Sequence, residues 1–262
     1  EKRLYRANFC RDRMCPACQR RRSLVVFHQV KNVCQSIQNE NPTFKYVLLT
    51  LTVPNVPADR LSDEVKHLAK SWDRLSKRVE FKKSIKGYFR ATEVTYNGER
   101  DDYHPHLHVL LCVPSGYFKK SYIKQSRWLE LWQESTRYPN ITQVDVRAIK
   151  PNPKRPESDA ISSAAAEVGK YATKPSQYVT RIPNGAYVAF KKVVNELAKG
   201  IARKRLISFG GIMKDHYEKL GLESVENENV NLIDVDGNSD SIEAAFRIIY
   251  RWNVGVGNYE GI

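Results

Sequence analysis

Long apolar segments are missing from this sequence, and cysteine is scarce. No stretch of the 262 residues reaches the length of about 20 apolar residues that a membrane-spanning helix requires, and no signal peptide is visible. Neither an internal repeat nor a glycine-rich cofactor-binding loop is found. The five cysteines include a cluster of three, a pattern that favours metal binding in a reducing compartment over disulfide bonds. We therefore expect a cytoplasmic protein with no membrane partner.

Acidic residues are too few to balance the basic ones. The chain has 43 Lys and Arg against 29 Asp and Glu, which gives a formal net charge of +14. The imbalance is uneven, because residues 223–262 hold eight acidic and two basic residues, net −6, and this leaves +20 on the first 222 residues. A basic body favours contacts with phosphates and makes binding dependent on salt. Ribosomal and membrane-surface proteins share this composition, so charge does not by itself identify the partner.

Three of the six histidines lie within five residues, at His104, His106 and His108. The apolar residues around and after them predict a strand, Tyr103–Val113. Because side chains alternate along a strand, His106 and His108 share a face, and two neighbouring imidazoles on a rigid strand can bind one divalent ion. A surface strand that merely carries histidines is the alternative. His104 has the same parity but precedes Pro105, so we do not expect it to bind the metal; it would support the site or contact DNA.

A third metal ligand is expected from the preceding strand, which is rich in β-branched and aromatic residues over Gly87–Tyr96. Asn97-Gly98 is a strong turn signal between the two strands. A hairpin centred near Arg100 places Glu93 opposite His106 or His108, on the same face of the antiparallel pair. The carboxylate would then approach both imidazoles. An exposed glutamate in an ion pair is the alternative.

A second reactive candidate lies in the segment Ser162–Pro175, whose alanine run predicts a helix that ends near the proline. Glu167 and Tyr171 are four residues apart and hence neighbours on one helical face, with Lys174 three residues further on. A phenol beside a carboxylate and an ammonium is a plausible nucleophile, because the cation lowers the cost of forming phenolate. Lys170 points about 100° away from Tyr171 on such a helix. A tyrosine that belongs to the core, with solvated lysines, is the alternative.

Taken together, these motifs resemble the rolling-circle replication initiators of small plasmids, which belong to the HUH endonucleases. Four segments match in the family's order: Leu48–Asn55, His104–Val109, Glu167–Lys174 and, less closely, Arg205–Gly211. The third segment is similar to the nucleophile helix of one subgroup, in which a single tyrosine follows a glutamate by one helical turn.

The resemblance implies a site-specific endonuclease and strand transferase that nicks a replication origin and later ends replication. Tyr171 would attack a phosphodiester, form a 5′-phosphotyrosyl link and release a 3′-hydroxyl. Mn²⁺ or Mg²⁺ on His106, His108 and Glu93 would position the phosphate. Glu167 would act as a general base on water at termination, or would only orient the phenol.

The same resemblance implies further partners and rival functions. The substrate would be single-stranded and hairpin DNA of the origin, contacted by Lys174 and Lys170. A host helicase would be a second partner. A related transposase or conjugative relaxase is one rival. A non-catalytic, zinc-containing DNA-binding protein is the other.

The cysteine cluster near the N-terminus predicts a structural zinc site. Cys10, Cys15 and Cys18 have a spacing that is typical of a zinc knuckle, and the arginines around them are expected to face DNA. A structural zinc has four ligands. Cys34 and His28 are candidates for the fourth, but a helix expected from Ser23 to Asn39 would carry Cys34 away, and the sequence begins without methionine, so we expect this ligand upstream. Unbonded thiols are the alternative.

The order of the expected elements indicates an α+β fold. We expect a central antiparallel β-sheet with helices packed on one face, as in the ferredoxin-like palm of the HUH family, plus a small zinc-knuckle-like segment at the N-terminus. The histidine strand would be central, with the nucleophile helix packed across it. Three parts are expected: residues 1–40, a Cys-rich basic segment and helix; 41–222, the nicking domain; and 223–262, an acidic segment packed on it.

Overall fold

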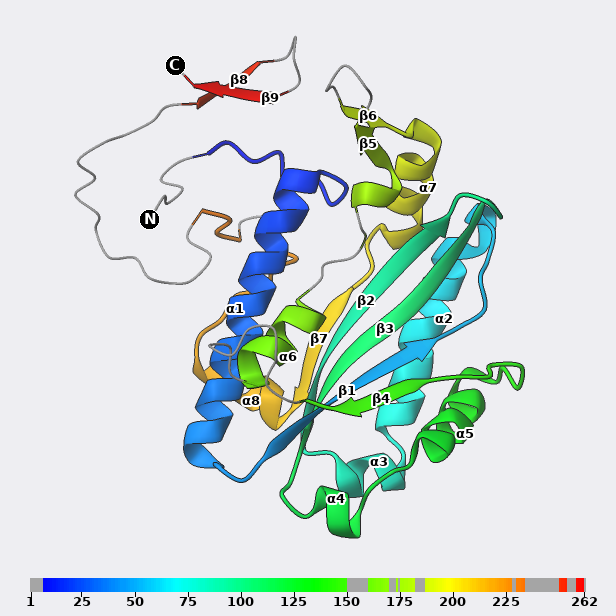
Figure 1. Cartoon of the computed structure of the whole chain (residues 1–262), viewed down its shortest axis with the longest axis vertical. Helices are drawn as coiled ribbons and strands as arrows, with labels where there is room; N and C mark the ends of the chain where they lie inside the picture. The colour runs from blue at the N-terminus through cyan, green and yellow to red at the C-terminus, as the bar shows by residue number, and fades with distance from the viewer. Residues whose placement is uncertain are drawn as a thin grey trace, which may run out of the picture.

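The computed structural model describes residues 7–149, 160–169, 173, 175–181, 187–227, 230–233, 250–253 and 258–261. Its helices are α1 (Pro16–Glu40), α2 (Ala58–Ser76), α3 (Val79–Ser84), α4 (Tyr117–Lys120), α5 (Gln125–Thr136), α6 (Ala160–Val168), α7 (Lys191–Ile201) and α8 (Ile212–Lys219), and a 3-10 turn, η1, covers Pro175–Gln177. Its strands are β1 (Lys45–Thr52), β2 (Gly87–Asn97), β3 (Asp102–Val113), β4 (Asp145–Ala148), β5 (Val179–Arg181), β6 (Tyr187–Ala189), β7 (Ile207–Gly211), β8 (Tyr250–Asn253) and β9 (Asn258–Gly261). Figure 1 shows their arrangement. Within the described residues, no helix combines the length and apolar character needed to cross a bilayer.

A five-stranded antiparallel sheet forms the centre of the fold, in the order β4-β1-β3-β2-β7 (Figure 1). The histidine strand, β3, is the middle strand, as expected. β2 and β3 form a long hairpin in which every residue from Gly87 to Asn97 has a partner. The side chain of Asn97 accepts hydrogen bonds from the backbone N–H groups of Glu99 and Arg100, which stabilises the predicted turn. The α+β class and the antiparallel sheet are confirmed.

Helices cover both faces of this sheet, so the expectation of helices on one face is wrong. Alternate residues of β3 belong to two different clusters of buried side chains. Leu107 and Val109 pack with side chains of α2 and α5, whereas Leu110 and Cys112 pack with side chains of α1, α6 and α8. Figure 1 shows α1 and α6 in front of the sheet and α2 behind it. The even-numbered residues of β3 include the histidines, so these point to the face covered by α1 and α6.

Helix α1 begins seven residues earlier than the sequence pattern predicts. Pro16 occupies its first turn and Cys15 precedes it as N-cap. Proline is favoured there because its fixed φ suits a helix and because the N–H it lacks would have no helical partner. Cys18 therefore lies in the first helical turn rather than in a loop before the helix.

Candidate metal centre and nucleophile segment

Three side chains converge on the central hairpin. Glu93 on β2 lies directly opposite His106 on β3, and His108 follows two residues later on the same face. One ligand atom from each residue lies within 4.8 Å of the other two. The expected approach of the carboxylate to both imidazoles is confirmed, while metal binding by the three residues stays a prediction.

The geometry and burial of this cluster suit a divalent cation. Oε2 of Glu93 lies 3.1 Å from Nε2 of His108 and 3.5 Å from Nε2 of His106. The side chain of Glu93 is 2% exposed, that of His106 10% and that of His108 22%. A carboxylate this buried is stabilised by neighbouring positive charge, which a cation would supply. Two imidazole nitrogens and one carboxylate oxygen form a donor set that fits Mn²⁺, whereas Mg²⁺ favours oxygen ligands and would keep several waters.

Hydrogen bonds at the other ring nitrogens orient both imidazoles. Nδ1 of His106 lies 3.1 Å from the carbonyl oxygen of His104. Nδ1 of His108 lies 3.5 Å from Oγ1 of Thr50, its neighbour on β1. When each Nδ1 donates, each Nε2 is left with its lone pair free for a metal. Thr50 was missed by sequence reasoning, although it lies inside the first matching segment.

His104 contacts His106 through its carbonyl and its ring, while its expected role, support of the site or a DNA contact, stays a prediction. Its carbonyl accepts the bond from His106, and its ring stacks on the His106 ring with centroids 5.3 Å apart. It lines a polar cavity of about 580 Å³ at the end of the hairpin, together with Asn55, Arg100 and Gln177. This volume lies in the range of sites that hold small ligands.

We call residues 160–178 the nucleophile segment; its helix, α6, lies on the same face of the sheet as the metal cluster. Helix α6 packs against β1 and β3, with Ala164, Ala165 and Val168 buried and Glu167 exposed. Its last residue is Val168, so a helix that continues to Pro175 is wrong. Gly169 is already outside the helix and has low helix propensity. Tyr171, Lys170 and Lys174 lie outside the described residues, and their expected roles stay predictions.

Tyr178, the nearest other tyrosine, is unsuited to attack DNA. Its side chain is 1% exposed, and its hydroxyl donates to the carbonyl of Met14 at 3.1 Å and receives a bond from Gln19 at 2.9 Å. Burial raises the pKa of the phenol above its usual value. A buried phenol with both hydrogen-bonding functions in use cannot reach a phosphate without local unfolding.

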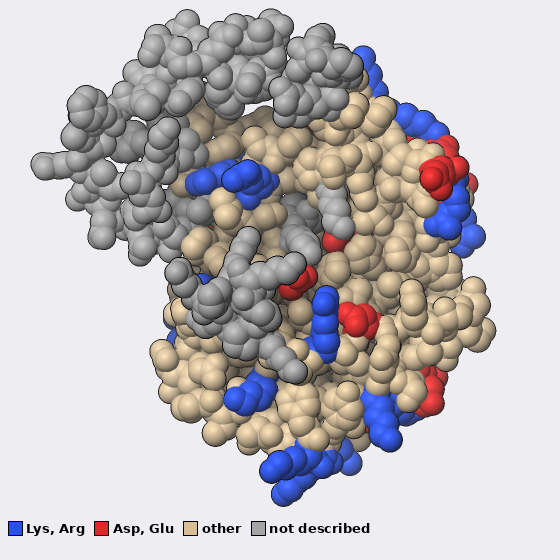
Figure 2. All heavy atoms as spheres, viewed as in Figure 1, with Lys and Arg blue, Asp and Glu red and all other residues tan. Residues whose placement is uncertain are grey.

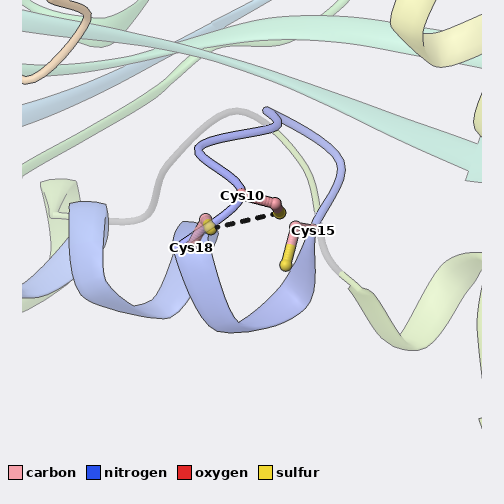
Figure 3. Close-up of side chains that lie close together, drawn as sticks. All are labelled: Cys10, Cys15 and Cys18. Atoms are coloured by element: carbon pink, nitrogen blue, oxygen red, sulfur yellow. Dashed lines mark hydrogen bonds between the residues drawn. The ribbon is translucent and has the colours of Figure 1, made fainter. Parts of the chain in front are cut away.

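The three clustered cysteines also converge (Figure 3). Cys10 and Cys15 lie on the loop before α1, Cys18 lies in its first turn, and the three sulfur atoms are within 4.8 Å of one another. Sγ of Cys10 is 3.6 Å from Sγ of Cys18, close to the sulfur separation of about 3.8 Å that a tetrahedral zinc with Zn–S bonds of about 2.3 Å imposes. Burial, and then the thiol of Cys10, raise the pKa of the Cys18 thiol to about 12. A metal bound here would therefore displace a proton.

Neither expected candidate for a fourth zinc ligand reaches this cluster. His28 and Cys34 lie ten and sixteen residues beyond Cys18 on α1, which corresponds to about 15 and 24 Å along the helix axis. Among the described residues, no other His, Cys, Asp or Glu joins the three cysteines.

Four arginines around the cysteines, Arg11, Arg13, Arg21 and Arg22, bind the protein itself, which corrects the expectation that they face DNA, whereas for the exposed Arg20 it stays a prediction. Arg13 donates to the carbonyls of Ile201 and Lys204. Arg21 donates to the carbonyls of Leu232 and Ile233, and the buried Arg22 to those of Arg11 and Asp12. These bonds attach the loop and α1 to the rest of the fold. On the face seen in Figure 2, Lys and Arg side chains form separate groups with acidic groups among some of them.

Comparisons with known proteins point to replication. A model of the replication protein family Rep_1 matches residues 1–260. The chain is 35% identical over 260 residues to "Protein rep" of Streptococcus pneumoniae serotype 2 (strain D39 / NCTC 7466), a match that covers 98% of this chain and 77% of the relative. It is 35% identical over 261 residues to "Protein rep" of Lactiplantibacillus plantarum, covering 98% and 81%. A "Replication protein" of Staphylococcus aureus is 34% identical over 234 residues, covering 88% and 96%.

No solved structure matches the chain. The resemblance to replication initiators that the sequence motifs carry is confirmed by the family match.

Proposed function

This chain belongs to the Rep_1 family of replication proteins, and we propose that it initiates rolling-circle plasmid replication as a metal-dependent DNA nicking and closing enzyme. One observation carries this proposal. Glu93, His106 and His108 bring their ligand atoms within 4.8 Å of one another, on the sheet face against which α6 packs. The segment that contains Tyr171 follows α6 directly.

Tyr171 is the nucleophile of the proposed reaction. Its phenol oxygen attacks the scissile phosphorus, so that an O–P bond to the tyrosine forms as the bond from phosphorus to O3′ breaks. The phenol loses its proton and O3′ gains one, which leaves a 3′-hydroxyl to prime synthesis. Because one phosphodiester replaces another, the reverse step rejoins strands without an external energy source.

Glu167 and two lysines assist these steps. Glu167 accepts a proton from the water that hydrolyses the final phosphotyrosyl link, which ends replication. Its exposed position on α6 leaves it accessible to water. Lys174 and Lys170 contact phosphates of the bound strand.

The two metal sites have separate roles. Glu93, His106 and His108 would hold Mn²⁺ or Mg²⁺, which would supply positive charge to the non-bridging oxygens of the scissile phosphate. Zn²⁺ held by Cys10, Cys15 and Cys18 is structural, with a fourth ligand outside the described residues.

The substrate is single-stranded and hairpin DNA of the origin. The polar cavity beside the metal cluster, lined by His104, Arg100 and Asn55 among others, can hold an unpaired nucleotide next to the reacting phosphate. A host helicase extends the opened duplex from the nick.

We propose residues 41–222 as the nicking domain, with 1–40 and 223–262 as its attachments. Both attachments contribute to one core. Val30 and Val33 of α1 are buried in the same cluster as Val230 and Leu232, together with side chains of the central sheet. Removal of either attachment would expose this cluster.

Supercoiled DNA of the replicon that encodes this chain is the substrate for the test. Incubation with Mn²⁺ should give nicked circles that carry the protein on a 5′ phosphate, and mass spectrometry should find the nucleotide on Tyr171. Tyr171→Phe should abolish this adduct. Tyr46→Phe is the control, because Tyr46 is a buried tyrosine whose hydroxyl bonds to the Cys34 carbonyl.

Two results would overturn the proposed mechanism. One is an adduct that persists in Tyr171→Phe, which would assign the attack to another residue. The other is a protein that shifts the DNA without cutting it at any Mn²⁺ concentration, which would indicate a non-catalytic DNA-binding protein.

A further inference from the structure

We propose that the cysteine loop positions the nucleophile segment through Gln19, and that this sets how Tyr171 meets the metal centre. We define the cysteine loop as residues Cys10–Cys18. This inference rests on the proposed function. It adds a residue, Gln19, that positions the nucleophile segment but takes no part in the proposed reaction.

Gln19 links the cysteine loop to the chain that follows α6. It is 2% exposed and directly follows Cys18. Its Nε2 lies 2.7 Å from the carbonyl oxygen of Arg13, 2.7 Å from Oγ1 of Thr173 and 2.9 Å from the hydroxyl of Tyr178. An amide nitrogen has two hydrogens for these three acceptors, so one hydrogen is shared. The buried amide therefore holds two points of the nucleophile segment against the loop.

Tyr178 adds a second link between the same two regions. Its hydroxyl donates to the carbonyl of Met14 at 3.1 Å while it accepts from Gln19. Buried groups of this kind are costly to leave without a hydrogen-bond partner. Thr173 and Tyr178 are thus both bound to Gln19, and Tyr178 also to the backbone of the cysteine loop.

The other side of the same segment is attached to the metal-bearing strand. Oε1 of Gln177 accepts a hydrogen bond from the backbone N–H of Tyr96 at 3.1 Å. Tyr96 lies three residues after Glu93 on β2. The segment therefore connects the cysteine loop with the strand that holds the carboxylate ligand.

This attachment limits where the predicted nucleophile can reach. Thr173 follows Tyr171 by two positions, and two residues of extended chain span at most about 7 Å. Fixing Thr173 would therefore limit how far the predicted nucleophile can move from this anchored point. A misplacement of about 1 Å can reduce the rate of a chemical step about 100-fold.

Metal on the cysteines would stabilise the acceptors that this network uses. Arg13 and Met14, whose carbonyls receive the bonds from Gln19 and Tyr178, lie between Cys10 and Cys15. A cation that joins these two cysteines to Cys18 closes the loop around both carbonyls. Loss of the metal would first make the carbonyls of Arg13 and Met14 mobile. The nucleophile segment, which is bound to them, would then become mobile too.

Gln19→Leu tests the network without altering a metal ligand. Gln29→Leu is the matched control, because Gln29 is also a buried glutamine of α1 whose amide binds one backbone carbonyl, that of Glu223 at 2.7 Å. It lies ten residues, or about 15 Å, further along the helix. Four quantities are measured in both variants: the single-turnover rate of adduct formation at saturating DNA, the Kd for an origin oligonucleotide, bound zinc, and hydrogen exchange of residues 173–181.

Gln19→Leu should lower the adduct rate about 10- to 100-fold, with DNA affinity and zinc content unchanged and faster exchange in residues 173–181. Gln29→Leu should match wild type in rate and in that exchange. Tyr178→Phe should behave as a weaker form of Gln19→Leu. Equal adduct rates in the two leucine variants would overturn the positioning role.

The exchange measurement separates this inference from the proposed function. If wild-type protein forms no adduct, the proposed function fails, but faster exchange in Gln19→Leu alone would still support the link between loop and segment. Unchanged exchange in Gln19→Leu would overturn the link whatever the activity.

Discussion

The two candidate metal sites are built in opposite ways. Glu93, His106 and His108 come from β2 and β3, and each of these strands is paired on both sides within the central sheet. The cysteines come from a loop and the first turn of α1. That loop is attached by side-chain bonds to backbone carbonyls, such as those of Arg13 to Ile201 and Lys204.

This difference indicates which site is formed before its metal binds. Strand pairing fixes the positions of the carboxylate and the imidazoles, so the hairpin would present its ligands whether or not a cation is bound. The cysteine loop has few backbone hydrogen bonds of its own, and a metal bound there would contribute directly to folding. We therefore expect damage to the first site to affect chemistry alone, and damage to the second to affect stability and chemistry together.

The largest effect should follow from His106→Ala. Loss of one imidazole leaves two ligands on the hairpin, and we expect the adduct rate to fall about 10³-fold or more. The unfolding midpoint should stay close to that of wild type, because β2 and β3 keep their pairing in the sheet when the side chain is removed. His67→Ala is the control, because His67 is a histidine of α2 outside both metal clusters, and it should keep most of the activity. If the adduct rate fell by the same factor in both variants, the assignment of His106 as a metal ligand would be contradicted.

An intermediate effect should follow from Cys15→Ala. Zinc should be lost, the unfolding midpoint should fall by several degrees, and the adduct rate should drop about 10- to 100-fold through displacement of the nucleophile segment. Cys34→Ala is the matched control, because Cys34 is a fully buried cysteine of α1 outside the cluster. It should lose stability through packing but retain zinc and adduct rate per folded molecule. Zinc content is measured by plasma mass spectrometry, and full zinc binding by Cys15→Ala would refute the site.

The sequence predicts the hairpin well and the nucleophile segment poorly, for physical reasons. Alternation of side chains and the turn at Asn97-Gly98 are local signals, and together they determine the register that places Glu93 opposite His106. The alanines of α6 also predict a helix, but Gly169 ends it earlier than Pro175 alone suggests.

Contacts between residues that are far apart in the sequence leave no signal in such local patterns. Gln19 meets Thr173 across 154 positions of the sequence, and nothing in either local sequence indicates that pairing. The same holds for the arginines near the cysteines, whose basic pattern predicts DNA contacts while their partners are carbonyls far along the chain. Helices on both faces were also missed, although the sequence contains a signal for them: every residue of β3 from Val109 to Val113 is apolar, which is typical of a strand buried on both faces.

The smallest effect should follow from Thr50→Val. The bond from Thr50 Oγ1 to His108 Nδ1 is long, at 3.5 Å, so its loss should weaken orientation of the ring without removing a ligand. Substitution of residues that support a metal ligand typically reduces metal affinity or activity 10- to 100-fold, and we expect about 10-fold here. Valine keeps the shape and β-propensity of threonine, and Thr50→Ser retains the hydroxyl as the matched control. The readout is the Mn²⁺ concentration at half-maximal nicking, which should rise in Thr50→Val and not in Thr50→Ser. An equal rise in both variants would show that packing of β1 against β3, rather than the hydroxyl, holds His108 in place.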